Sequence, residues 1–270
     1  MNEAPRPKID MTVAHPARRY DYWLGGKDNF AVDRDSGDAI GAAFPAIRTA
    51  VIENRAFMRR AVTLLAQEVG IRQFLDIGTG IPTRPNAHQV AQGIAPSARV
   101  VYVDNDPMVL VHARALMTSS PEGATAYIDA DLRDPDTILG DPGLRRVLDL
   151  SKPVALMLVA VLHFIPDEAD PWGIVARLLQ ALPSGSYLVA SHATYDALPE
   201  ETAQRLRAAI ANTREPGGPR GHEEFARFFD GLVMLPPGIV SVADWRAEQE
   251  VQPRPTPAET AVYGAVARLP

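Results

Sequence analysis

The pattern of apolar and polar residues alternates between short buried strands and amphipathic helices. Apolar residues recur at steps of three, four and seven through residues 46–69, which predicts a helix with one apolar stripe that ends at Gly70. A strand is expected near 72–77, directly after this helix. The strands predicted next are 100–104, 124–128, 153–162 and 186–191, and the helices between them are 86–92, 106–117, 134–150 and 168–182.

This alternation predicts an α/β fold with a doubly wound, mostly parallel sheet. Residues 153–162 form the most apolar run, and ten residues fit a central strand rather than a membrane span. The alternation stops after residue 191. The segments predicted there are a helix at 200–211, a loop at 213–221, a short helix at 222–229 and strands at 232–242 and 260–269.

The segment from His15 to Phe30 combines four aromatic residues, a double glycine and several charges. Two interpretations stay open: a short helix that docks on the domain, or a lid over a ligand with Gly25 and Gly26 as hinge. We therefore divide the chain into an N-terminal arm at 1–45 and a domain at 46–270, with cover helices inserted at about 196–230.

Composition narrows the classes of protein. Of 270 residues, 46% are hydrophobic and 22% are charged, which is enough apolar material for a sizeable core. The net charge of −6 argues against a nucleic-acid-binding protein. Cysteine is absent, so thiolate chemistry and cysteine-ligated metals are excluded. Without an apolar leader or a membrane-length apolar run, we expect a soluble cytoplasmic protein that does not bind membranes.

The stretch from Phe74 to Thr83 reads as a buried strand that breaks into a glycine turn, and a helix pattern follows it. Dinucleotide-binding turns favour a third glycine, but Thr83 stands at that position. Pro82 also removes a backbone N–H that a pyrophosphate would need. The turn, with Gly78 and Gly80, therefore suits S-adenosylmethionine, which carries no phosphate, better than a nicotinamide dinucleotide.

Three acidic residues stand at the ends of three consecutive predicted strands. Asp76 could face the ammonium group of this cofactor, and Asp104 could accept both ribose hydroxyls. Asp131 could bind the adenine amino group while the Leu132 N–H reaches a ring nitrogen. The alternative for Asp104 and Asp131 is that each only caps the helix that follows.

Long motifs over nearly the whole chain carry a family resemblance. They are ARRYDYWLGGKDNFAVDR (17–34), NRAFMRRAV (54–62), RQFLDIGTGIPT (72–83), NAHQVAQ (86–92), ARVVYVDNDPMVLVHARALM (98–117), ADLRDPDTIL (130–139), PVALMLVAVLHFIPD (153–167), LPSGSYLVASH (182–192) and FFDGLVMLPPGIVSVADWR (228–246). The chain resembles the S-adenosyl methyltransferases common in actinobacteria, a class I family long catalogued as a domain of unknown function. Pro85 and Gln89 depart from the residues expected in that family.

The resemblance implies a Rossmann-like, seven-stranded sheet whose last strand is antiparallel, and S-adenosylmethionine as cofactor, with S-adenosylhomocysteine as product. Class I enzymes place substrate-facing residues just after the fourth strand, which here makes His163 the first candidate for a base or an orienting group. The alternative is that His163 bonds a neighbouring loop. His192, after the fifth strand, is the second candidate.

The predicted cofactor set also includes Thr79 and Asn105 beside the strand ends, and Tyr22, Gly25 and Gly26 from the arm. No metal site is expected, because His163 and Asp167 alone would not hold an ion.

The sequence thus predicts a methyltransferase that acts at oxygen or nitrogen of a small molecule. The alternatives are a regulatory protein that binds S-adenosylmethionine or S-adenosylhomocysteine without transfer, and an NAD(P)-dependent oxidoreductase. The methyl acceptor and a homodimer are left open.

Overall fold

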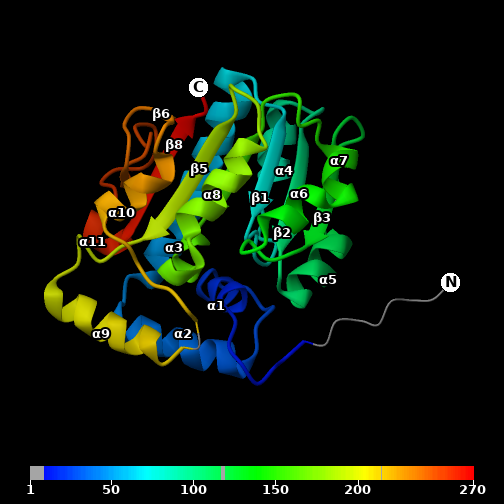
Figure 1. Ribbon diagram of the computed structural model, residues 1–270. Helices are drawn as coiled ribbons and strands as arrows, with labels where there is room; N and C mark the ends of the chain where they lie inside the picture. Colours follow the sequence, from blue (N-terminus) through cyan, green and yellow to red (C-terminus); the bar gives the residue numbers. More distant parts are fainter. Residues whose placement is uncertain (1–8, 117–118, 214) are drawn as a thin grey trace.

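The computed structural model describes residues 9–116, 119–213 and 215–270, so Met117 of the predicted helix 106–117 lies outside the described residues. Within them, eight strands form one sheet in the order β3-β2-β1-β4-β5-β8-β6, and β7 pairs with β8 (Figure 1). The strands are β1 Gln73–Ile77, β2 Arg99–Asp104, β3 Ala124–Asp129, β4 Ala155–Val159, β5 Tyr187–Ala193, β6 Val233–Met234, β7 Val240–Ser241 and β8 Val262–Arg268. The first five are parallel and β8 runs antiparallel to β5, which confirms the predicted α/β fold with an antiparallel last strand. The described residues form eight strands rather than the expected seven, because the predicted strand 232–242 supplies both β6 and β7.

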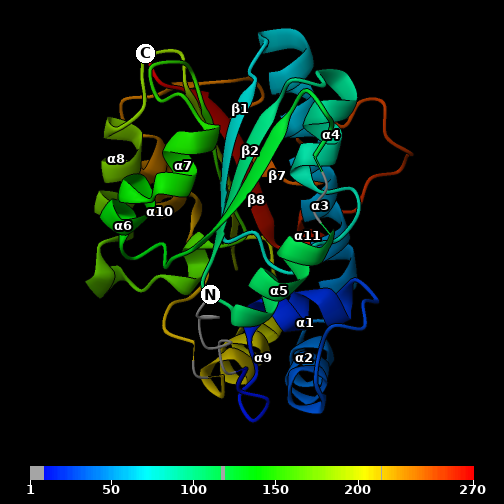
Figure 2. The ribbon, with the colours of Figure 1, turned by 90° about the vertical axis from the view of Figure 1, so that its right-hand side faces the viewer.

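Helices cover both faces of the sheet (Figure 2). One face carries α3 Ile47–Leu64 and α4 Ala87–Ile94, and the other carries α6 Pro135–Gly140, α7 Pro142–Val147, α8 Pro171–Gln180 and α10 His222–Ala226. Successive side chains of a strand point to opposite faces, so Phe74 packs in the α3 layer and Leu75 in the α8 layer. No helix in the described part of the chain has the length and apolar character needed to cross a bilayer.

The predicted helix 46–69 ends at Gly70 as expected, but its last turn is wider than an α-helix. Residues Leu65–Val69 form a π-helical turn, η1, and Gly70 adopts a φ of 86°. The Ile71 N–H donates to the Leu65 carbonyl across this turn at 2.8 Å. The wider turn changes the phase of the helix, so Val69 is exposed instead of continuing the apolar stripe.

Three other segments differ from the predictions for local reasons. The predicted helix 134–150 is two short helices, α6 and α7, because Asp141 and Pro142 end one and begin the next. The predicted strand 153–162 is β4 alone, since Ala160 turns out of the strand with a φ of 55°. The predicted strand 232–242 is divided into β6 and β7 by the turn at Pro236–Gly238.

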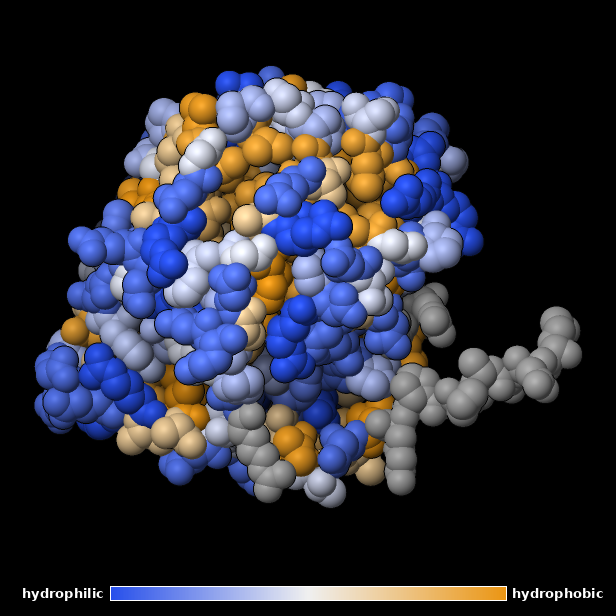
Figure 3. Space-filling model, viewed as in Figure 1, coloured by the Kyte–Doolittle hydropathy of each residue, from blue (hydrophilic) through white to orange (hydrophobic). Residues whose placement is uncertain are grey.

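The N-terminal arm lies across the carboxyl ends of the parallel strands. It contains α1 Pro16–Trp23 and α2 Ala31–Ala43, and α2 packs against α9 Glu200–Ala211 (Figure 1). A separate apolar cluster joins these elements, with Phe44 and Leu206 buried in it. The face seen in Figure 3 is largely hydrophilic around α9, while hydrophobic residues gather in its upper half. The arm and α9 therefore pack against each other at the end of the sheet where the parallel strands finish.

The remaining helices are short or connect strands. They are α5 Pro107–Leu116 and α11 Pro257–Thr260, together with the 3-10 turns η2 Leu162–Phe164, η3 Asp167–Ala169 and η4 Arg227–Phe229. The η2 turn directly follows β4, so the segment predicted to face a substrate begins at the same sheet edge as the arm.

Candidate active site

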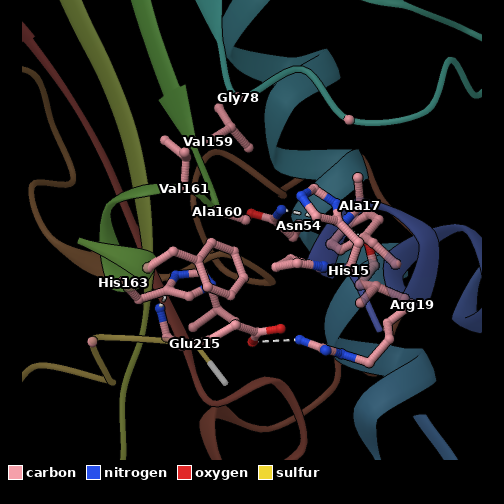
Figure 4. Close-up of a pocket in the computed structure, with 18 of the residues that line it drawn as sticks. His15, Ala17, Arg19, Asn54, Gly78, Val159, Ala160, Val161, His163 and Glu215 are labelled. Carbon is pink, nitrogen blue, oxygen red and sulfur yellow. Dashed lines mark hydrogen bonds and ion pairs between the residues drawn. The ribbon is translucent and has the colours of Figure 1, made fainter. Parts of the chain in front are cut away.

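A cavity of about 510 Å³ lies between the carboxyl ends of the parallel strands and the N-terminal arm (Figure 4). This volume falls within the range of sites that bind small molecules, about 300–1,000 Å³. Nine residues predicted from the sequence line it. They are Asp76, Gly78, Thr79, Gly80, Asp104, Asn105, Asp131, Leu132 and His163.

The glycine turn is pressed between β2 and the segment after β4. The N–H groups of Gly78 and Thr79 both donate to the Val103 carbonyl, at 2.8 and 3.3 Å. A Cβ at Gly78 would lie 2.4 Å from Cγ2 of Val161, and the φ of Gly78 is 75°. Gly80 also has a positive φ, 68°. Glycine is therefore required at Gly78 for two reasons, its backbone conformation and its neighbour.

Asp76 presents a carboxylate to the cavity without a protein partner. No hydrogen bond or ion pair to this carboxylate is formed by any residue that the structure describes. Burial raises the pKa of Asp76 to about 7, although the positive charge of Arg55 opposes the rise. A carboxylate without a partner inside a cavity suits a cationic ligand group such as an ammonium.

Asp104 holds the glycine turn and the start of α5 in place. One carboxylate oxygen accepts the Gly80 N–H at 2.7 Å and the other accepts the Asp106 N–H at 3.0 Å. Burial raises the pKa of the Asp104 carboxyl. The side chain that caps α5 is Asp106, which accepts the Met108 N–H at 2.9 Å. Asp104 is therefore not the N-cap residue of α5, which was the alternative interpretation of its position.

Asp131 is fixed at the end of β3 by two neighbours. It accepts hydrogen bonds from Asn105 Nδ2 at 2.9 Å and from the side chain of Arg133, and the Arg133 bond lowers the pKa of Asp131 to about 2. The cap of α6 is Asp134, so Asp131 does not serve as that cap. Among the described residues, no group accepts the Leu132 N–H, which leaves it available to a ring nitrogen.

The structure does not bring Tyr22, Gly25 and Gly26 to this cavity. The Tyr22 hydroxyl donates to Asp38 of α2 at 2.7 Å, on the side of α1 that faces away from the strands. Gly25 and Gly26 are exposed in the turn after α1. Their inclusion in the predicted cofactor set is corrected for this reason. The arm instead supplies other aromatic side chains, Tyr20 and Trp23, to the cavity wall.

The two candidate bases differ in their surroundings. His192 is fully buried, with Nδ1 2.7 Å from the Ala193 carbonyl and Nε2 3.1 Å from Arg220. The carbonyl can only accept and the guanidinium can only donate, so both ring nitrogens are occupied. Burial lowers the pKa of His192 to about 3. His192 does not line the cavity, and the prediction that it acts as a base is wrong.

His163 lines the cavity at the start of η2 (Figure 4). Its Nδ1 lies 3.5 Å from the Ala193 N–H, which can only donate. Burial, together with His192 and Arg220, holds the pKa of His163 well below its usual range. The ring is therefore neutral at pH 7, and its Nε2 has no protein partner among the described residues.

Several cavity residues were not singled out from the sequence. Arg19 of α1 forms an ion pair with Glu215 at 2.5 Å, and Asn54 of α3 bonds both the Tyr20 hydroxyl and Ser191. Arg220 does not line the cavity itself, but it is buried behind the cavity wall and donates to the carbonyls of the segment after β4. The partners in these contacts are separated by 34 to 196 positions, so no local pattern indicates them.

Within the described residues, no cluster of three or more histidine, cysteine, aspartate or glutamate side chains has the arrangement of a metal site. The polar groups that face the cavity can form hydrogen bonds and an ion pair with an organic ligand. Asp76 can receive a cation and the Leu132 N–H a ring nitrogen. The remaining lone pairs of Asp104 can receive hydroxyl donors. The residues present therefore fit S-adenosylmethionine.

Comparisons with known proteins agree with this geometry. The chain is 50% identical to a DUF574 family protein from Streptomyces avermitilis, with a TM-score of 0.92 over 97% of this chain and 100% of that one. It is 41% identical to a candidate methyltransferase from Thermobifida fusca, with a TM-score of 0.88 over 98% of both chains. An S-adenosylmethionine-dependent methyltransferase from Anabaena variabilis shares the fold, at 13% identity and a TM-score of 0.50 over 100% of both chains.

No curated protein matches the chain. The model of the S-adenosyl methyltransferase family matches residues 2–270, which is nearly the whole sequence. The chain therefore belongs to the S-adenosyl methyltransferase family, and it is an S-adenosylmethionine-dependent methyltransferase.

Proposed function

We propose that the protein transfers the methyl group of S-adenosylmethionine to an oxygen or nitrogen atom of a small molecule. One observation carries this proposal: a single cavity joins the strand-end carboxylates to an apolar region under α2 and α9. Such a cavity can hold a cofactor at one end and a second organic molecule at the other. A purely regulatory cofactor-binding protein would not need the second region.

In this proposal, each strand end binds a different part of the cofactor. Asp76 would face the ammonium group, Asp104 the ribose hydroxyls, and Asp131 with the Leu132 N–H the adenine. Gly78, Thr79 and Gly80 let the backbone approach the ligand, and Asn105 orients Asp131. Once bound, the cofactor supplies a methyl group already activated by its sulfonium. The protein then has to align the acceptor and exclude water.

We propose His163 as the side chain that orients the acceptor. With Nδ1 directed at the Ala193 N–H, the neutral ring carries its proton on Nε2. That nitrogen can donate a hydrogen bond to an acceptor molecule, and it could take a proton only after a change of tautomer. This favours the orienting role over the role of general base. Asp167 does not assist His163, because its carboxylate is bonded to Arg220.

The N-terminal arm, residues 1–45, is proposed to act as the cover of the cavity. His15 Nδ1 lies 2.9 Å from the Asp106 carboxylate, and Arg18 lies near Asp33 and Asp106. These contacts attach the arm beside Asp104, at the proposed ribose site. A small-molecule acceptor, and not a nucleic acid, suits both the covered cavity and the net charge of −6. A cytoplasmic location and a homodimer stay predictions.

Two measurements test the proposed function. Calorimetry with S-adenosylhomocysteine measures cofactor binding, and S-adenosylmethionine with a labelled methyl group, offered with a panel of phenols, amides and amines, measures transfer. We expect binding together with transfer to at least one oxygen or nitrogen acceptor. Binding without transfer to any member of the panel would favour the regulatory alternative, and absence of binding would contradict the cofactor assignment.

A further inference from the structure

A buried ion pair lies in the part of the cavity away from the glycine turn. Arg19 comes from α1 and Glu215 from the loop before α10, 196 positions later. Arg19 Nη2 and Glu215 Oε2 are 2.5 Å apart. Figure 4 shows this pair at one end of the view and Gly78 at the other, with His163 between them. The pair thus belongs to the acceptor end of the site.

Both members of the pair have unused hydrogen-bonding capacity. Arg19 is 3% exposed, and its Nε and Nη1 atoms are buried with no hydrogen-bond partner among the described residues. Oε1 of Glu215 is also buried and has no hydrogen-bond partner among the described residues. Buried polar atoms of proteins nearly always have a partner. Arg19 and Glu215 both line the cavity, so a ligand bound there is the group that can supply the missing partners.

The residues that follow Glu215 pack against the segment after β4. Gly217 has a φ of 122°, and a Cβ there would lie 2.6 Å from the His163 carbonyl oxygen, so the loop contacts the segment after β4 directly. At the other end of the loop, Arg220 donates to the carbonyls of Leu162 and Ile165, at 3.1 and 2.7 Å. The chain just after Glu215 is therefore packed against the segment after β4.

The surroundings of the pair are otherwise apolar. Trp23 of α1, Ile40 of α2, Phe44 and the α9 residues Leu206 and Ile210 all line the same cavity. All five belong to one apolar cluster with α2 and α9, or pack directly against it. An acceptor bound here would bury an apolar body against these side chains and present a polar group to the pair.

The charge of the pair selects the kind of polar group. Arg19 and Glu215 already neutralise each other, and a further net charge in an apolar cavity would be costly. A neutral group that carries a hydrogen-bond donor beside an acceptor satisfies both open sides at once. We propose that Arg19 and Glu215 bind the methyl acceptor, a largely apolar and uncharged small molecule with such a group, for example a carboxamide. This inference rests on the proposed methyltransferase function.

Three probes of one size test it on the complex of the full chain with S-adenosylhomocysteine. Benzamide is neutral and carries both a donor and an acceptor, benzoate is an anion that only accepts, and benzylamine is a cation that only donates. We expect calorimetry to give benzamide an affinity at least about tenfold higher than either charged probe. Equal affinities, or no binding of any probe to the complex, would overturn the proposal.

Two variants should change the preference in opposite directions. Glu215→Gln leaves the guanidinium unpaired, so benzoate should become the preferred probe, and Arg19→Gln should favour benzylamine. If the ion pair served only to hold α1 against the loop, the two variants would not change which probe binds most tightly. Arg205→Gln removes an exposed ion pair on α9 and is the control that should leave all affinities unchanged. Thermal midpoints verify that each variant is folded.

The outcomes separate this inference from the cofactor assignment. If Arg19→Gln weakens S-adenosylhomocysteine binding while the ranking of probes stays the same, the pair serves the cofactor and the inference is wrong. If the wild-type protein does not bind S-adenosylhomocysteine at all, the proposed function fails first, before any probe is added.

Discussion

Asp76 should make cofactor binding depend on pH near neutrality. Its carboxylate faces the cavity without a protein partner, and burial raises its pKa to about 7 in the ligand-free protein. The nearby charges are Arg55, which favours the ionised carboxylate, and Asp104, which opposes it. If the ionised form receives the ammonium group of the cofactor, the affinity must follow the ionised fraction of Asp76.

The magnitude follows from the pKa. One unit below a pKa of about 7 roughly one-tenth of the carboxyl groups are ionised, and one unit above it roughly nine-tenths are ionised. Affinity for S-adenosylhomocysteine should therefore rise about tenfold between pH 6 and pH 8, or about 1.4 kcal/mol. Calorimetry at pH 6, 7 and 8 measures this change. Asp76→Asn is the matched control, because it removes one carboxyl and leaves His15 and every other titratable group in place.

The same shift has an opposite effect on the ligand-free protein. The folded-state pKa lies above the model value of 3.8, so the folded protein binds this proton more tightly than the unfolded chain. The contribution of Asp76 to the free energy of unfolding is therefore largest below about pH 4, and it decreases as the pH rises to about 7. Asp76→Asn should remove that decrease in thermal unfolding. A flat affinity profile in the wild type, or an equal slope in Asp76→Asn, would refute the reasoning.

Three further substitutions test other parts of the site. Asp104→Ala should weaken S-adenosylhomocysteine binding at least about tenfold, and unchanged affinity in calorimetry would remove the ribose assignment. Gly78→Ala should lower the free energy of unfolding by about 1–3 kcal/mol in denaturant titration, because its Cβ meets Val161; Gly231→Ala, with a φ of 78° and open space, is the control for backbone strain alone, and an equal loss there would contradict the contact argument. His163→Ala should lower the turnover of an acceptor more than it lowers cofactor affinity, and an unchanged rate would exclude an orienting role.

The part of the candidate site at the strand ends could be predicted from the sequence because local signals determine it. Each buried strand is an apolar run, and the residue that follows it must lie at the carboxyl edge of a parallel sheet. Asp76 and Asp104 lie at the ends of β1 and β2, Asp131 lies two residues after β3, and all three line the cavity. The turn between Gly78 and Gly80 is equally local, since positive φ values favour glycine.

The acceptor end could not be predicted because long-range contacts determine it. Tyr22 and Trp23 are adjacent in α1 and both contact α2, yet about 100° separates them around the helix, and of the two only Trp23 also lines the cavity. The sequence predicts that His192 follows a strand as His163 does, but His192 lies within β5, and Arg220, 28 positions later, occupies its outer nitrogen. The spacing of residues along the sequence cannot predict a contact of this kind.

A crystal structure of the complex with S-adenosylhomocysteine tests the central claim most directly. The account predicts the ribose hydroxyls at the Asp104 carboxylate, a ring nitrogen of adenine at the Leu132 N–H, and the ammonium group at Asp76, with the space beside Arg19 and Glu215 left for an acceptor. The account would be contradicted by a ligand bound outside this cavity, or by one whose amino-acid end lies on the Arg19–Glu215 pair.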